Sequence, residues 1–147
     1  MNKYTKIIQD EKAEIEAVRE EERLASERMA QEQKKKSVEV IKLFVDIVYQ
    51  EVEEAVTALN SEGVRSEMIK KADKSDYYCK LIIPDSTLYS IEFKVDENCV
   101  RNGLFFKVGN VFNETQTDIS YRIIPANQES VKKEIADFIK KALPTIK

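Results

Sequence analysis

The sequence predicts an α+β domain with a helical arm at its N-terminus. Three observations lead to this prediction: no glycine or proline occurs before Gly63, strand-like runs of alternating polarity follow it, and residues 128–143 have helical periodicity. We expect a long N-terminal helical segment broken near 34–37, an antiparallel four- or five-stranded meander, and a C-terminal helix packed on the sheet. The predicted parts are a charged helical arm, 1–36, and an α+β domain, 37–147.

The arm is highly charged and has few apolar side chains to bury. Residues 16–36 hold 12 charged side chains in 21 positions. A narrow apolar stripe follows heptad positions, and glutamates interrupt it. The stripe consists of Ile8, Ile15, Val18, Ala25 and Met29, and the interrupting residues are Glu11, Glu22 and Glu32. Two interpretations stay open: a solvated helix, or an arm that becomes ordered against a second copy or another protein.

The helical segment 38–59 carries a stronger apolar stripe. Its apolar positions keep an unbroken 3-4 spacing: Val38, Ile41, Val45, Val48, Val52, Ala55 and Leu59. We expect this helix to be the structural centre and the site of self-association, with Phe44 and Ile47 facing the domain's own strands. The two stripes are centred roughly 120° apart around the helix axis. This offset leaves two interpretations: the helix breaks at the KKKS sequence, with Ser37 as a new N-cap, or its two halves meet different surfaces. We favour the bend or break.

Beyond Gly63 the periodicity becomes that of strands. The run 88–96 alternates cleanly, so we expect Ile91, Phe93 and Val95 to face the helices and Glu92 and Lys94 to face solvent. Further strands are predicted at 77–83, 104–112 and 118–124, while 65–76 is ambiguous between an edge strand and a loop. Short links between neighbouring runs imply an antiparallel meander. Gly109 is a candidate bulge, and Asn127 is the expected cap of the last helix.

The composition excludes several classes of site. The chain of 147 residues has no histidine, so Ser-His-Asp and Cys-His catalytic pairs and histidine-bound zinc are excluded. We expect no cofactor and no metal site. Two cysteines are too few for a disulfide framework, and a buried reduced thiol is the preferred interpretation of Cys79. The net charge of −3 argues against nucleic acid as a partner. No run is long and apolar enough to span a membrane, so we expect a cytoplasmic protein.

One stretch has the pattern of a catalytic motif. PDSTLYSIEFK contains Asp85, Glu92 and Lys94 and resembles the PD-(D/E)xK signature of restriction-type nucleases. This resemblance implies a divalent metal held by the two carboxylates and a lysine that helps to position or activate water. Asp85, however, belongs to a predicted turn, and seven residues of strand would separate it from Glu92 by roughly 15–20 Å. The other interpretation places Glu92 and Lys94 on a solvated stripe.

Three functional hypotheses follow from these features. The first is a non-enzymatic protein–protein interaction module of the adaptor, inhibitor, immunity or chaperone kind, which self-associates through Val38, Ile41, Val45, Val48, Val52 and Leu59. The alternative is a metal-dependent nuclease built on Asp85, Glu92 and Lys94. The third is a small-molecule or nucleotide sensor that uses exposed aromatic residues of the sheet. We favour the first, with a protein partner and a homo-oligomeric state.

Overall fold

The computed structural model describes residues 2–146. The chain divides into two compact units, one ending at Lys35 and the other beginning at Lys36. The helices are α1 (Thr5–Leu43), the π-helical turn η1 (Phe44–Val48), α2 (Tyr49–Ser61), α3 (Gln128–Ala142) and the short 3-10 turn η2 (Leu143–Thr145). The strands are β1 (Glu67–Asp73), β2 (Asp76–Ile82), β3 (Ser90–Val95), β4 (Phe105–Val111) and β5 (Arg122–Pro125). The α+β class predicted from the sequence is confirmed.

The predicted break near residues 34–37 is wrong, because α1 is helical without interruption from Thr5 to Leu43. Ser37 therefore lies inside a helix and is not an N-cap. Its hydroxyl instead donates to the carbonyl oxygen of Glu97 at 2.7 Å. Because neither glycine nor proline occurs here, the backbone has no intrinsic reason to leave the helical conformation.

The irregularity lies about two turns later, at η1, and it determines which helix face is buried. The buried positions Val40, Phe44, Val48 and Val52 are four residues apart. In a regular α-helix of 3.6 residues per turn, each such step would turn the stripe by about 40°. The i→i+5 turn of a π-helix holds more residues per turn and offsets this drift. The four side chains can therefore share one face and reach one core.

The predicted self-association seam does not lie on a single exposed face. Val48, Val52 and Leu59 are buried in the core of their own domain, and Ile41 is half-buried. Val38 and Val45 remain exposed, because the π-helical turn brings Val40 and Phe44 to the core in their place. A second chain could not contact the three buried seam residues without opening this core.

The sheet is an antiparallel meander with the strand order β1-β2-β3-β4-β5. Residues 65–76, ambiguous in the sequence, supply β1 and the turn to β2. The helix α2 ends before Gly63, whose φ of +82° favours glycine. Gly109 pairs directly with Glu92 in a regular ladder, so the predicted bulge is wrong. Asn127 caps α3 as expected, accepting from the Ser130 N–H at 2.8 Å.

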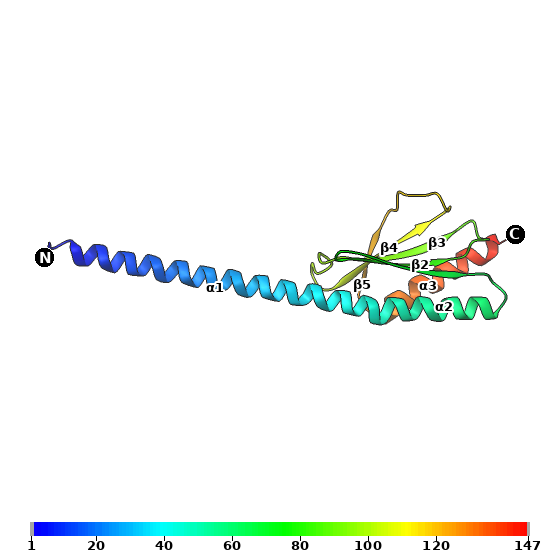
Figure 1. Ribbon diagram of the computed structural model, residues 1–147, viewed down its shortest axis with the longest axis horizontal. Coiled ribbons are helices and arrows are strands. Elements are labelled where there is room, and N and C mark those ends of the chain that lie inside the picture. The colour runs from blue at the N-terminus through cyan, green and yellow to red at the C-terminus, as the bar shows by residue number, and fades with distance from the viewer. Residues whose placement is uncertain (1, 147) are drawn as a thin grey trace. The chain divides into compact units, whose positions relative to one another are not determined.

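The core lies between one face of the sheet and the helices η1, α2 and α3. Figure 1 shows α2 and α3 on the same side of the strands. Ile91, Phe93 and Val95 of β3 face this side and are buried, as predicted. Phe44 meets Phe106 edge to face, with ring centroids 5.4 Å apart. The opposite face of the sheet, which we call the outer face, is therefore free of helices and carries the candidate site.

Candidate functional site on the outer face of the sheet

The three residues of the nuclease-like pattern are not brought together. Asp85 is exposed and pairs with Arg65 at 3.2 Å. Glu92 pairs with Lys80 at 3.3 Å and accepts a hydrogen bond from the hydroxyl of Tyr121. The two carboxylates share no partner. Within residues 2–146, no group of three or more His, Cys, Asp or Glu side chains is placed to hold a metal ion.

The expected solvated stripe is also wrong at Glu92, whose exposure is only 3%. The cover comes from residues 119–121, which cross the outer face before β5. A Cβ on Gly109 would lie 2.5 Å from Cγ2 of Ile119 and 3.0 Å from the carbonyl oxygen of Ser120. Glycine at this position therefore makes room for the crossing chain and lets the Tyr121 hydroxyl reach Glu92.

The polar groups under this segment form a linked cluster. The ammonium of Lys94 lies 5.3 Å from the Tyr78 ring centroid and 5.7 Å from that of Tyr121. Burial, together with the hydrogen bond to Glu92, raises the pKa of the Tyr121 phenol. Tyr121 therefore stays a neutral donor at neutral pH, and Glu92 has a partner on either side. This arrangement accounts for the buried carboxylate without a metal or a substrate.

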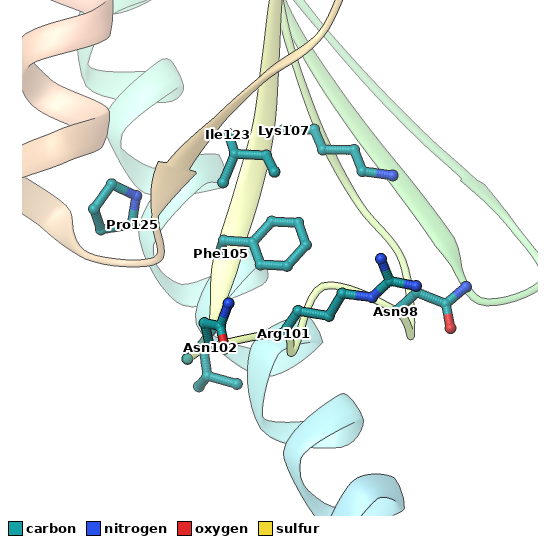
Figure 2. Close-up of a pocket in the computed structure, with 9 residues that line it drawn as sticks. Asn98, Arg101, Asn102, Phe105, Lys107, Ile123 and Pro125 are labelled. Atoms are coloured by element: carbon teal, nitrogen blue, oxygen red, sulfur yellow. The ribbon is translucent and has the colours of Figure 1, made fainter.

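A groove of about 700 Å³ lies beside this cluster, where β4 and β5 meet the loop 98–104. Its lining residues are Asn98, Arg101, Asn102, Gly103, Leu104, Phe105, Lys107, Ile123 and Pro125. Figure 2 shows Phe105 and Ile123 side by side on neighbouring strands, with the charged groups of Arg101 and Lys107 on the same side of the phenyl ring. Ile123 is 67% exposed, which is unusual for a large apolar side chain on a strand. The groove thus combines an apolar floor with a cationic wall.

Local backbone conformation holds the loop in place. Asn102 and Gly103 have φ angles of +52° and +110°, values that suit asparagine and glycine. The Phe105 N–H donates to the carbonyl of Cys99 at 3.1 Å, and the Ala126 N–H donates to that of Leu104 at 3.2 Å. These bonds tie both ends of the loop to the sheet, so the groove is built into the fold.

Asp96 positions Lys107 of the cationic wall and the start of the loop. It receives the Lys107 ammonium at 3.1 Å and the Asn98 N–H at 2.9 Å, and the Cys99 thiol lies at 3.5 Å. Burial opposes ionisation of Asp96, but these donors together hold the pKa of its carboxyl below its usual value. Arg101 has no ion-pair partner within residues 2–146. The groove lining contains no carboxylate, and its unpaired positive charge is that of Arg101.

Both cysteines are free and buried, in agreement with the expectation for Cys79. Burial raises the pKa of the Cys79 thiol to about 12 and that of Cys99 to about 11. Both therefore stay protonated at neutral pH and act as small core residues.

The comparisons with known proteins add no assignment: the chain matches no protein-family model, no curated protein and no solved structure. Among the helices of residues 2–146, none combines the length and apolar character needed to cross a bilayer.

The groove was not predicted from the sequence. The loop itself was expected, and the NG pair at 102–103 is a recognisable turn signal. No sequence pattern, however, indicates that Arg101 and Ile123 line the same groove, because they are 22 positions apart on different elements. An apolar strand residue on the face away from the core, such as Ile123, can be identified only once the buried face is known.

Proposed function

We propose that the protein is a non-enzymatic protein–protein interaction module of the adaptor, inhibitor or chaperone kind, which also associates with itself. The observation that carries the proposal is the groove on the outer face. In its apolar floor Ile123 is exposed in the single chain and Phe105 is half-buried, and exposed apolar surface next to polar groups is typical of binding sites.

The chemistry of the groove favours an acidic partner segment with apolar side chains. Arg101 offers a guanidinium without an internal partner, and a guanidinium can bind a carboxylate through two parallel hydrogen bonds. Lys107, which is paired with Asp96, adds a further ammonium donor, and the side-chain amides of Asn98 and Asn102 add donors. Leucine or phenylalanine side chains of the partner would cover Phe105 and Ile123. The occupant we propose is therefore an extended peptide of alternating acidic and apolar residues.

The position of β5 supports an extended conformation of this peptide. β5 is the last strand of the sheet and pairs only with β4. Its other edge offers backbone groups for a further strand, and in strand addition alternate side chains of the peptide face the same side of the sheet. Residues at every second position would then reach the groove, which agrees with an alternating pattern.

The proposal can be tested with a synthetic peptide of alternating Glu and Leu residues. We expect saturable binding, with chemical-shift changes at the Ile123 methyl groups. Arg101→Glu should weaken binding at least tenfold, because it removes an attractive contact and adds a repulsive one. The matched control is Lys132→Glu on the exposed side of α3, which makes the same charge change outside the groove.

Two results would contradict this proposal. One is equal binding of a Lys/Leu peptide, which would show that charge does not select the partner. The other is displacement of the Glu/Leu peptide by a single-stranded oligonucleotide at a concentration lower than that of the peptide. This result would make nucleic acid the better ligand of the groove.

A further inference from the structure

The arm has an apolar stripe that nothing covers in the single chain. Every residue from Lys6 to Lys36 is exposed. The stripe continues at heptad spacing to the start of α1, and its large side chains have exposures between 48% and 72%. They are Tyr4, Ile8, Ile15, Val18 and Met29. A helix that relies on propensity and surface ion pairs alone is marginal, so a second surface on this stripe would stabilise it.

Charged residues border one side of the stripe and have no partners of their own. They are Glu14, Glu21, Arg28 and Lys35, spaced by seven, and no ion pair within residues 2–146 involves them. The ion pairs that the arm does make join Arg23 to Glu20 at 2.5 Å and to Glu27 at 2.7 Å. By heptad position these three residues lie on the side opposite the stripe. The bordering charges therefore remain available to another helix.

We propose that the arms of two copies pair in antiparallel orientation, with Val18 of one copy against Met29 of the other. In an antiparallel pair of helices, bordering positions of the same kind face one another across the seam. This register places Glu14 opposite Lys35 of the second copy and Glu21 opposite its Arg28. By two-fold symmetry each contact occurs twice, so the pair contains four complementary charge contacts.

Other registers bring like charges together. A shift by one heptad in one direction places Glu21 opposite Glu21 and Arg19 opposite Arg19 of the second copy. A shift in the other direction places Arg28 opposite Arg28 and Glu22 opposite Glu32. Each shift therefore introduces repulsion that the proposed register lacks.

A parallel pair is also disfavoured. In parallel register Glu11, Glu22 and Glu32 would each face their own copies within the seam. In the proposed register they face Lys36, Ala25 and Ile15 of the second copy. Polar residues in a seam lower its stability and select its register. The glutamates that interrupt the stripe therefore have a role as selectors of antiparallel pairing, and we expect the dimer to be weak and sensitive to salt.

This inference rests on the self-association part of the proposed function and is independent of the groove. The first experiment measures the dimer dissociation constant of the full chain by sedimentation at low salt. Glu21→Arg should raise that constant about tenfold, because two attractive contacts become repulsive. Combining Glu21→Arg with Arg28→Glu should restore the parent value, since the exchanged charges again face opposite charges. Glu16→Arg is the control, with the same charge change outside the seam.

The second experiment measures orientation with a spin label at Ala13→Cys; the two native cysteines are buried. In the proposed register the two labels lie roughly 30 Å apart along the axis, whereas in a parallel pair they lie at the same height on the axis, on the outer sides of the two helices. A parent chain that stays monomeric at all accessible concentrations would contradict self-association itself. A dimer whose dissociation constant does not respond to the charge exchange, or whose labels lie at the same height, would contradict only the antiparallel arm pairing.

Discussion

Glu92 shows how a single residue can look catalytic in the sequence and be structural in the fold. It completes a nuclease-like pattern, yet its carboxylate is engaged by Lys80 and Tyr121. A buried carboxylate without partners would be strongly disfavoured, so these contacts are required for the burial. Gly109 makes them possible by its missing side chain. Three residues on three different segments thus account for one buried charge.

Asp96 provides a prediction at the same scale. Asp96→Asn should lower the free energy of unfolding by roughly 1 kcal/mol at pH 7, because the Lys107 ammonium loses its ionised partner. The pKa of Asp96 is lower in the folded chain than in the unfolded one. The ionised Asp96 therefore contributes its full share to the free energy of unfolding at pH values above its pKa in the unfolded chain. That contribution is lost as the pH falls through its pKa in the folded chain.

Urea unfolding at several pH values checks this prediction. The difference between parent and variant should begin to shrink near about pH 4 and vanish at lower pH. The control is Asp46→Asn, which changes an exposed carboxylate outside this cluster. A difference that stays constant down to the lowest pH would show that Asp96 acts through its shape and not its charge.

At the scale of elements, the π-helical turn η1 decides how the helical segment meets the sheet. The sequence 38–59 satisfies a heptad pattern, but the buried face follows the four-residue spacing of Val40, Phe44, Val48 and Val52. Both stripes are apolar, so the sequence alone does not rank them. The sheet selects the second one, because Phe44 fits against Phe106.

A deletion and an insertion at η1 test this account. Asp46 is exposed, and its removal should change the spacing of the four buried residues Val40, Phe44, Val48 and Val52 from 4-4-4 to 4-3-4. A regular α-helix presents residues at this spacing on one face. We expect the deletion variant to keep its free energy of unfolding within about 1 kcal/mol of the parent. Inserting an alanine after Asp46 should instead rotate α2 by about 100° and turn Val52 away from the core.

Urea unfolding and the near-ultraviolet circular dichroism of the tyrosines are the measurements. If the deletion unfolds the protein as completely as the insertion does, the π-helical turn is required for the fold and does not merely correct the spacing.

At the scale of the whole molecule, the two units differ in what holds them together. The unit from Lys36 onward contains all the buried side chains of the described residues. In the unit up to Lys35, the described residues form one exposed helix with two solvent-exposed ion pairs, which stabilise it only weakly. The folding free energy of a single chain therefore belongs to the second unit.

Removal of residues 1–34 should accordingly leave a cooperative thermal transition. The truncated chain keeps every buried residue, so its midpoint should stay within a few degrees of that of the full chain measured at concentrations below dimer formation. Differential scanning calorimetry of both chains is the check. Loss of the transition would mean that the arm contributes to the core.

Local periodicity in the sequence determined the element order of this protein: helical up to Gly63, strand-like beyond it, and helical again after Asn127. These features depend on neighbours within one turn or one strand pair, so they can be predicted without a structure. The tertiary structure decided which stripe of 38–59 is buried, why Glu92 is covered, and that Arg101 and Ile123 form one groove. Each of these depends on contacts between segments distant in the chain, where several arrangements satisfy the same local pattern and only packing distinguishes them.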